Sequence, residues 1–253
     1  MPSTTYLITG ANRGIGKGLT AALLQRPHTT IIAGVRDPAV SATILDSLPT
    51  AAGSKVIVVK IDSQSEADAK EAVSQLSTQH NITSLDVVIA NAGIAHSGTS
   101  VAQTSSESLR DHLNTNAIGP VLLFQAFRPL LQASKCGNPV FLATSTVVGS
   151  IGGQEALAGL PPVLSPNGAS KAALNWVVRR LHYEEPWLTA YVTHPGLVLT
   201  DMASGMFGTP EQAAAMGAIT VDVSVAGILK TLDQASREIG GTFQNYDGTT
   251  LPW

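Results

Sequence analysis

TGANRGIG, residues 9–16, joins a short apolar run at Tyr6–Thr9 to a helical pattern that begins at Gly14. Glycines at such a corner permit a tight turn and bring backbone N–H groups close to a ligand. The amino end of the following helix attracts anions, because its first N–H groups have no partners inside the helix. A glycine-rich turn between the first strand and the first helix therefore predicts a diphosphate-binding site.

Beyond this turn, short β-rich runs alternate with longer helical stretches. Strands are expected at residues 6–9, 30–35, 55–61, 85–90, 139–144, 188–193 and 242–245, and helices at residues 14–25, 41–48, 66–80, 106–133, 169–184 and 221–236. Pro120 and Pro129 interrupt the fourth helix, where bends are expected. The apolar strands lack period-2 alternation, which is typical of a parallel sheet covered on both faces. The sequence predicts an α/β fold: one Rossmann-type, doubly wound parallel sheet with helices on both faces, spanning residues 1–253.

Composition excludes several classes of protein. The 253 residues carry a net charge of −3, with 44% hydrophobic and 13% charged residues. No excess of Lys and Arg is present to neutralise phosphates, so no nucleic-acid partner is expected. The first ten residues are not a signal peptide, and no apolar run is long enough to span a membrane. The one cysteine, Cys136, suits a reducing, cytoplasmic location, although a secreted protein without disulfides would look the same.

Two stretches interrupt the alternation and are expected to be substrate-side loops. Residues 149–168 are rich in Gly and Pro, and residues 200–217 are rich in Ala, Gly and Met. Both follow predicted strands, so both should rise above the carboxyl edge of the sheet, where open α/β sheets bind ligands. The methionines at 202, 206 and 216 have an alternative interpretation as ordinary adaptable packing residues.

The TGxxxGxG pattern resembles that of the short-chain dehydrogenase/reductase family, and further motifs follow in order. Residues 91–93 (NAG) are similar to a family motif after the fourth strand, and Asn116 in NTNAIGP matches the family's structural and catalytic Asn. Lys171 in GASKAAL matches the Lys of the YxxxK motif. Residues 195–200 resemble the loop that holds the nicotinamide carboxamide. The terminal NYDGTTLPW is similar to that of fungal secondary-metabolism ketoreductases.

The resemblance implies an oxidoreductase that acts on a small molecule with a nicotinamide cofactor, and no metal site is expected. Family members are commonly dimers or tetramers formed through two long helices, here 106–133 and 169–184. The expected cofactor-binding residues are Gly10, Asn12, Arg13, Gly14, Ile15, Gly16, Arg36, Asp62, Ser63, Asn91, Ala92, Gly93, Lys171, Pro195, Gly196, Val198 and Thr200. The candidate catalytic residues are Asn116, Ser145, Thr146, Asn167 and Lys171.

The choice between the two nicotinamide cofactors follows from charge. An acidic residue at the end of the second strand would favour NAD by accepting a hydrogen bond from the ribose 2′-hydroxyl. This corner instead reads Gly34-Val35-Arg36-Asp37, and the glycine turn contributes Arg13. Two guanidinium groups suit a 2′-phosphate, so NADP(H) is predicted. The alternative is that both arginines are solvated surface residues, with Arg36 paired to Asp37.

The sequence departs from the family at the position of the active tyrosine. That tyrosine stands four residues before the lysine, and here the position is Asn167. A spacing of four places residue 167 and Lys171 on one face of a helix. A carboxamide can donate a hydrogen bond, but it cannot deliver a proton near neutral pH. The site therefore lacks the proton donor that the resemblance would imply.

Several other residues are candidates for the missing acid. Tyr183 lies too far along the same helix, about 24 Å from residue 167. Ser145 or Thr146, at the family's serine position, can polarise a carbonyl but is not acidic. His194 lies beside the cofactor loop and His96 follows the NAG motif. The ordinary pKa of histidine suits acid catalysis near neutral pH, and the alternative is that both histidines are structural. Arg128 has three alternative interpretations: it lines the substrate pocket, it binds cofactor, or it is an ordinary charged residue on a helix surface.

Three explanations remain open at this point. The first is a reductase for an iminium ion, which needs no protonation at the hydride-transfer step, as in fungal indole-alkaloid pathways. The second is a carbonyl reductase whose acid is substituted, either naturally or by engineering. The third is a non-catalytic NADP(H)-binding protein. Loss of a positioned general acid typically costs about 10²–10⁴-fold in rate.

Overall fold

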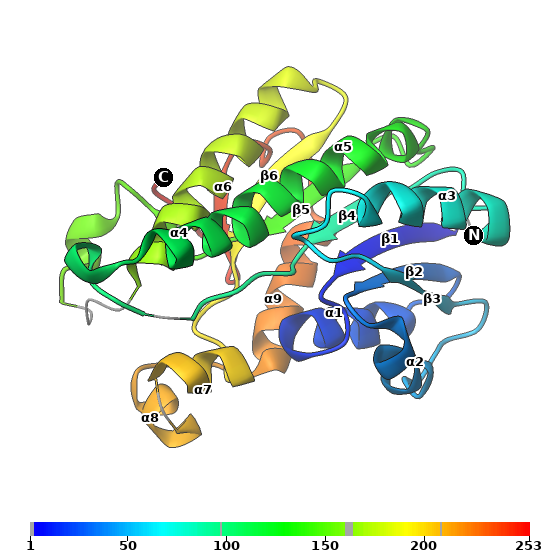
Figure 1. The fold of residues 1–253 in the computed structure, drawn as a ribbon. Helices are drawn as coiled ribbons and strands as arrows, with labels where there is room; N and C mark the ends of the chain where they lie inside the picture. The colour runs from blue at the N-terminus through cyan, green and yellow to red at the C-terminus, as the bar shows by residue number, and fades with distance from the viewer. Residues whose placement is uncertain (1–2, 97, 160–163, 208) are drawn as a thin grey trace.

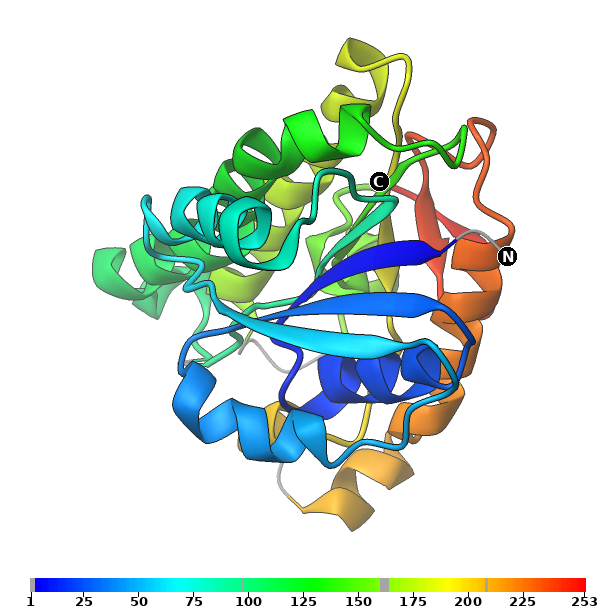
Figure 2. The ribbon, with the colours of Figure 1, turned by 90° about the vertical axis from the view of Figure 1, so that its right-hand side faces the viewer.

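Eight strands form one sheet in the described residues of this computed structural model, which are 3–96, 98–159, 164–207 and 209–253 (Figures 1 and 2). The strand order is β3-β2-β1-β4-β5-β6-β7-β8, with every pair parallel except β7 and β8. The strands are β1 (Thr4–Thr9), β2 (Thr29–Val35), β3 (Lys55–Lys60), β4 (Val87–Ala90), β5 (Val140–Thr144), β6 (Thr189–His194), β7 (Phe243–Asn245) and β8 (Thr250–Leu251). The predicted α/β fold with a parallel sheet is confirmed.

Helices cover both faces of this sheet, as the two ribbon views show. One face carries α3 (Asp68–His80), α4 (Ser106–Leu113), α5 (Gly119–Gln132) and α6 (Ser165–Glu184). The other face carries α1 (Gly14–Leu24), α2 (Pro38–Asp46) and α9 (Val221–Asp233). Successive strand residues point to opposite faces, so Leu7 and Ile32 join one buried core while Ile8 and Ile31 join the other. Burial on both faces explains the absence of alternation in the strand sequences.

The strand order places a crevice at the carboxyl ends of β1 and β4. After β1, the chain adds β2 and β3 on one side, then crosses back to place β4 on the other. Ligands bind at such a switch point in open α/β sheets, because the following loops diverge there. Thr9 at the end of β1 and Asn91 just after β4 meet at this point, where the Asn91 amide donates to the Thr9 carbonyl oxygen over 3.0 Å.

The long helix predicted at 106–133 is divided in a different place from the one expected. A π-helical turn at Asn114–Ile118 separates α4 from α5, and Pro120 lies in the first turn of α5. The helix is not interrupted at Pro129, because α5 continues through it. Pro129 and Gln125 are exposed. The carbonyl that loses its helical partner therefore faces water, which reduces the cost of an internal proline.

Other boundaries also differ from the sequence expectation. Helix α6 begins at Ser165 rather than residue 169, so Asn167 lies in its first turn. The 200–217 segment, expected to be a loop, contains the short helices α7 (Asp201–Phe207) and α8 (Pro210–Ala215). Strand β8 was not predicted; it pairs antiparallel with β7 after a turn. Residues 160–163 of the 149–168 segment lie outside the described residues, as does residue 208. Within the described ranges, no helix is long and apolar enough to cross a bilayer.

Candidate functional site

The turn between β1 and α1 has the geometry of an anion-binding corner. Gly10 and Gly14 adopt φ angles of 65° and 51°, which favour glycine. A Cβ atom at Gly16 would overlap the carbonyl oxygen of Gly10, so α1 approaches the turn closely. Arg13 is the N-cap of α1, and its side chain makes no capping hydrogen bond. The first N–H groups of α1 therefore remain available to a ligand, and the residues present fit a diphosphate.

Thr9 and residues 91–93 hold the two sides of the crevice together. The Thr9 hydroxyl accepts from the backbone N–H groups of Asn91 and Ala92 over 3.1 and 3.0 Å. The Asn91 side chain donates to the Thr9 carbonyl oxygen and accepts from the hydroxyl of Thr144 over 3.3 Å. Asn91, predicted to bind cofactor, thus has its carboxamide engaged within the protein. Its observed contacts fix the shape of the crevice.

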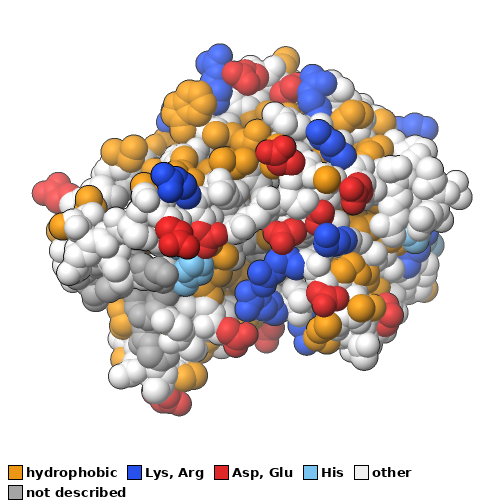
Figure 3. Space-filling model, in the orientation of Figure 1, with side chains coloured by type: hydrophobic (Ala, Val, Ile, Leu, Met, Phe, Trp, Pro, Cys, Tyr) orange, Lys and Arg blue, Asp and Glu red, His pale blue; other side chains and the backbone are white. Residues whose placement is uncertain are grey.

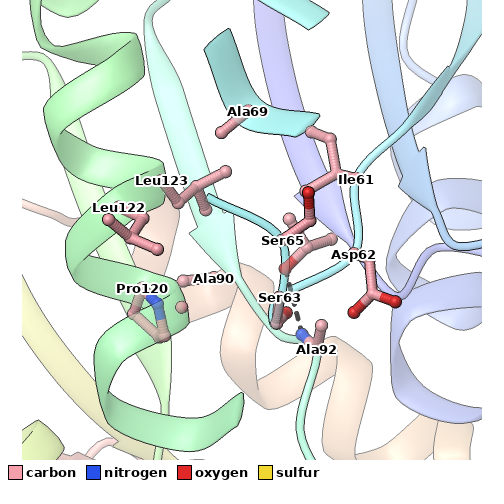
Figure 4. A pocket seen from close by; sticks show the side chains of 12 residues that line it. Ile61, Asp62, Ser63, Ser65, Ala69, Ala90, Ala92, Pro120, Leu122 and Leu123 are labelled. Carbon is pink, nitrogen blue, oxygen red and sulfur yellow. Dashed lines mark hydrogen bonds between the residues drawn. The ribbon is translucent and has the colours of Figure 1, made fainter. Parts of the chain in front are cut away.

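A pocket next to the crevice brings together the predicted residues Asp62, Ser63 and Ala92 (Figure 4). Apolar side chains from α5 and α3 form its wall, and the figure shows Pro120, Leu122 and Leu123 opposite Ser63. The carboxylate of Asp62 accepts from the N–H of Gln64 over 3.0 Å. The pocket is lined by Thr9, Ile61, Asp62, Ser63, Ser65, Ala69, Ala90, Ala92, Gly119, Pro120, Leu122 and Leu123. The enclosed space is only about 10 Å³, enough for one water molecule, so this pocket does not itself hold a heterocycle and Asp62 lies at its rim.

The two arginines predicted to select the cofactor are both exposed. Among the described residues, the side chains of Arg13 and Arg36 form no hydrogen bond and no ion pair. Asp37, the alternative partner of Arg36, instead caps α2 by accepting from the N–H groups of Ala39 and Val40. Figure 3 shows Lys and Arg side chains grouped over the amino end of α1. The alternative Arg36–Asp37 pair is therefore absent, and both guanidinium groups are available to a ligand.

Asn12 and Ile15, the other predicted members of the glycine turn, are half-buried. The Asn12 side chain donates to the hydroxyl of Ser41 on α2 over 3.1 Å. This contact ties the turn to the segment that follows Arg36. Ile15 packs at the edge of the core beneath α1. Both contacts support the turn from the protein side.

Lys171 is the buried cation of the site. Its side chain donates from Nζ to the carbonyl oxygen of Thr144 at the end of β5, over 2.6 Å. Desolvation lowers the pKa of Lys171 to about 8. A Cβ atom placed on Gly93 would lie 3.5 Å from Nζ and 3.1 Å from Oδ1 of Asn116. Glycine at 93 therefore lets the NAG segment lie directly over Lys171.

Asn116 lies in the π-helical turn, and its carboxamide is fully engaged. Oδ1 accepts from the N–H of Ile94, and Nδ2 donates to the carbonyl oxygen of Ile94, each over 2.9 Å. Nδ2 also donates to the hydroxyl of Ser170, which in turn donates to the carbonyl oxygen of Asn167. Asn116 thereby joins the NAG segment to the first turn of α6. These contacts support a positioning role, because both N–H groups of the carboxamide are used within the protein.

The two hydroxyls at the family's serine position have different surroundings. Ser145 is buried and donates to Oδ1 of Asn175 over 2.5 Å, while Asn175 donates to the carbonyl oxygen of Gly149. Ser145 is thus used to hold β5 against α6. Thr146 is half-buried and lies at the start of a 3₁₀ turn, Val147–Gly149. Of the two candidates, Thr146 has the accessible hydroxyl. Sequence reasoning missed Asn175, which lies four residues after Lys171 and therefore on the same face of α6.

Asn167 carries an unsatisfied group at the amino end of α6. Its side chain is 9% exposed, and its Oδ1 is buried without a hydrogen-bond partner. Its backbone carbonyl is held by Ser170, one turn before Lys171. A buried amide oxygen without a donor is costly unless a ligand or water supplies one. This atom therefore marks a place where a ligand or a water molecule is expected to donate, in the first turn of α6 and four residues before Lys171.

The two histidines considered as replacement acids are in contrasting environments. His194 ends β6, and burial lowers its pKa to about 4, so it is neutral near pH 7. Its Nδ1 is buried without a partner. His96 lies near the surface, where its Nε2 is 3.0 Å from Oδ2 of Asp111. The backbone N–H of His96 donates to Nε2 of the buried His112. His112 was not among the residues predicted from the sequence. A neutral His194 is a poor acid, and His96 has a carboxylate partner.

The segment after β6 is shaped by contacts with α9 and the 217–219 turn. Pro195 accepts from the buried hydroxyl of Ser224 over 2.6 Å. Gly196 has φ of 87°, a conformation that favours glycine. Val198 forms an isolated bridge with Ile219, and the hydroxyl of Thr200 accepts from the N–H of Ala203. The predicted nicotinamide loop is therefore ordered by the protein itself and runs past Gly14, whose Cβ would lie 3.4 Å from Thr200.

Arg128 and Tyr183 lie away from these groups. Arg128 donates to both carboxylate oxygens of Glu185 and stacks on the ring of Trp187. The Glu185 partner raises the already high pKa of Arg128. This pairing is the helix-surface alternative of the sequence analysis. Tyr183 is 61% exposed and contacts the ring of His182.

The segment at residues 200–217, predicted to be a substrate-side loop, exposes apolar side chains. Met202 and Met216 are 40% and 46% exposed, on α7 and after α8. The side chain of Met206 lies outside the described residues. Among the described residues, no group of three or more His, Cys, Asp or Glu side chains is placed to hold a metal ion.

Comparison with known proteins gives consistent matches. The family model described as short chain dehydrogenase matches residues 4–210. Norsolorinic acid ketoreductase nor1 of Dothistroma septosporum is 40% identical over 252 residues, covering 99% of this chain and 92% of the relative. The norsolorinic acid ketoreductase of Aspergillus parasiticus is also 40% identical, covering 99% of this chain and 91% of the relative.

Solved structures agree with these sequence relatives. The NADPH-bound carbonyl reductase from chicken fatty liver superposes with a TM-score of 0.85 at 30% identity, over 100% of both chains. Carbonyl reductase Sniffer of D. melanogaster gives a TM-score of 0.82 at 27% identity, also over 100% of both chains. The NADPH in the chicken protein agrees with the NADP(H) prediction. Glycine turn, crevice, buried lysine and whole-chain relatives lead to one conclusion: the chain belongs to the short-chain dehydrogenase/reductase family and is an oxidoreductase.

Proposed function

We propose that the protein is an NADPH-dependent reductase of a small ketone, in the manner of fungal secondary metabolism. The observation that carries this proposal is the cluster at the carboxyl edge of the sheet. Buried Lys171 bonds to Thr144 at the end of β5 and lies close to Gly93, Thr146 follows Thr144 by two residues, and Asn167, with its unpartnered Oδ1, lies one turn before Lys171. The ketoreductase and carbonyl reductase relatives support a carbonyl substrate.

NADP(H) is the cofactor that the exposed arginines favour. Arg13 and Arg36 have no described partner, and no carboxylate lies at the end of β2, where Val35 is the last residue. A phosphate group takes paired, charge-assisted hydrogen bonds from guanidinium groups. When bound, the cofactor supplies the hydride. The first turn of α1 would hold its diphosphate, and Asp62 would lie beside its adenine, as the family resemblance implies.

The chain's own residues then position the carbonyl group and its developing negative charge. The Thr146 hydroxyl donates a hydrogen bond to the carbonyl oxygen. The Lys171 ammonium, already held by Thr144, contributes positive charge and remains protonated below a pKa of about 8. In a site that excludes water, such fixed groups stabilise an alkoxide strongly. Lys171 Nζ carries a proton below a pKa of about 8, whereas His194, with a pKa of about 4, is neutral near pH 7.

Asn167 favours a second candidate, the reduction of a cyclic iminium. Its buried Oδ1 accepts but does not donate, which suits a cationic substrate or one that carries an N–H group. Hydride transfer to an iminium removes a charge and requires no proton at that step. Lys171 opposes this reading, since its buried positive charge would repel an iminium ion.

The test is NADPH consumption by the unmodified protein with matched panels of aromatic ketones and cyclic iminium ions at neutral pH. Faster ketone turnover supports the proposed function, and faster iminium turnover replaces it with the second candidate. Tight NADPH binding without turnover on either panel would indicate a non-catalytic binding protein. Equal affinities for NADPH and NADH would contradict the cofactor proposal.

We also propose that the protein forms a homodimer or homotetramer in the cytoplasm. An apolar groove lies between α5 and α6, with Phe124 and Trp176 among its lining residues, and Trp176 is 68% exposed. Figure 3 shows hydrophobic side chains gathered over these helices. Replacing Trp176 with Glu should shift the mass measured by light scattering to that of a monomer.

A further inference from the structure

We propose that Pro252 and Trp253, the last two residues of the sequence, are positioning residues. They hold the segment at residues 150–154 in place and thereby set the affinity of the protein for its ketone substrate. The proposal rests on the reductase function above. It concerns the segment at residues 150–154, which leaves the 3₁₀ turn after Thr146 and leads toward Asn167. Nothing in the sequence pattern linked this segment to the chain end, because about a hundred residues separate them.

The contacts between the two segments centre on the buried Ser150, whereas Gly152 and Pro252 are exposed. The hydroxyl of Ser150, which is 3% exposed, donates to the carbonyl oxygen of Pro252 over 2.7 Å. The N–H of Gly152 donates to the carbonyl oxygen of Trp253. The same Ser150 hydroxyl accepts from the N–H of Gly153 over 2.9 Å. One serine therefore connects the chain end to the segment on the substrate side.

Trp253 is itself held from two sides. The guanidinium of Arg179 on α6 lies 4.9 Å from the centre of its ring, a cation–π distance. The ring of Phe243 on β7 lies 5.8 Å away on the sheet. Figure 1 shows the C-terminus beside α6. Trp253 thus contacts both α6 and the sheet, and its carbonyl oxygen accepts from Gly152. Its position fixes the 150–154 segment relative to these two elements.

The glycines of the segment fit this contact closely. A Cβ atom at Gly152 would lie 2.9 Å from the carbonyl oxygen of Trp253, and one at Gly153 would lie 2.8 Å from the hydroxyl of Ser150. The segment therefore lies flat against the chain end, with no side chain between them. The Gln154 side chain folds back to the carbonyl oxygen of Ser150 over 2.9 Å. A segment pinned in this way between Thr146 and Asn167 presents a fixed surface to the substrate.

The main variant is Trp253→Ala, with Trp253→Phe as the conservative variant and Tyr183→Ala as an aromatic truncation elsewhere on α6. Norsolorinic acid and the ketone panel serve as probes. We expect Trp253→Ala to raise KM for the ketone, and its Kd on the NADP⁺-loaded protein, by roughly tenfold. The kcat and the Kd for NADPH should stay within about twofold. Trp253→Phe should recover most of the lost affinity, and Tyr183→Ala should match the unmodified protein.

Hydrogen exchange at residues 150–154 gives a readout that needs no turnover. Faster exchange of the Gly152 and Gly153 amides in Trp253→Ala, together with the KM increase, supports the proposal. Unchanged exchange, or an unchanged KM despite faster exchange, overturns it. Parallel losses in NADPH affinity, kcat and melting temperature would also overturn it, since they indicate a general structural role. If the unmodified protein binds no ketone, the reductase proposal fails, and the substrate-affinity role fails with it.

Discussion

The cofactor side and the substrate side of this molecule differ in how completely their buried polar groups are hydrogen-bonded. In the part of the chain that the structure describes, the buried side-chain atoms without a partner are Ser108 Oγ, Asn167 Oδ1, Tyr191 OH, Thr193 Oγ1 and His194 Nδ1. None of these lies in the described residues 3–96, which form the first four strands and the glycine turn. Three of them lie at Asn167 and at the end of β6, toward the substrate side.

This difference has a physical explanation. The crevice on the cofactor side is built from backbone groups and from side chains such as Thr9 and Asn91 that bond one another. Such a framework is complete before a ligand arrives, so it suits one invariant ligand. On the substrate side, Asn167 and His194 have polar atoms that only a ligand or water can satisfy. Specificity is therefore expected to reside in the second half of the chain.

The largest expected effect is on the cofactor side. Gly16→Ala should reduce NADPH affinity by roughly 10³-fold, about 4 kcal/mol, because a Cβ atom would overlap the Gly10 carbonyl and displace α1. Fluorescence titration measures the affinity, and circular dichroism checks the fold. Gly159→Ala is the control, since nothing lies within 4 Å of that added atom. An affinity close to that of the unmodified protein would show that the turn is not rigid.

Lys171 joins the two sides, and its loss should be nearly as severe. Lys171→Met should lower ketone turnover by roughly 10²–10³-fold, the usual effect of removing one charge-stabilising group. The exposed Lys230→Met on α9 should have no effect. In the unmodified protein, turnover should fall as pH rises through about 8, where the buried ammonium loses its proton. A pH profile that stays flat well above 8 would contradict a role for this charge.

The same pKa has a consequence for folding. Because burial lowers the pKa of Lys171 in the folded state, the free energy of unfolding should increase as pH rises from about 8 toward 10.5. Lys171→Met should remove this dependence. Urea unfolding at several pH values measures the free energy of unfolding of the unmodified protein and of Lys171→Met.

On the substrate side, the sharpest test is to supply the missing acid. Asn167→Tyr should raise ketone turnover by about 10²-fold, the scale of a positioned general acid, because Lys171 lies one turn further along α6. Asn167→Phe, which adds the ring without the hydroxyl, should give no gain. If both variants are equally slow with every ketone, the site is not an ordinary carbonyl reductase site without its tyrosine.

The smallest effect is expected from the exposed arginines. Arg13→Ala or Arg36→Ala should each weaken NADPH binding by roughly tenfold while leaving NADH binding unchanged, because only NADPH carries the 2′-phosphate. Lys55→Ala, at the amino end of β3, is a matched surface control. Equal losses for both cofactors would mean that the two arginines act on the diphosphate instead.

The sequence by itself determined the sheet, the glycine turn and the nucleotide side. These features depend on local patterns: short apolar strands of about four to seven residues, glycines at a strand–helix corner, and the motifs at residues 91–93 and 195–200. Such patterns can be recognised in a sequence because the contacts that form them join residues close together in the chain. Helix and strand ends shifted by a few residues, since caps and frayed turns are decided by a single hydrogen bond.

Only the tertiary structure decided how the substrate side is arranged. Three hydrogen bonds join residues that are 27 to 102 positions apart in the sequence. They are Ser145 to Asn175, Lys171 to Thr144, and Ser150 to Pro252. Strand β8 and the π-helical turn before Pro120 also escaped prediction. Each depends on which distant backbone group is left unpaired when the sheet and helices pack, and no local pattern encodes that outcome.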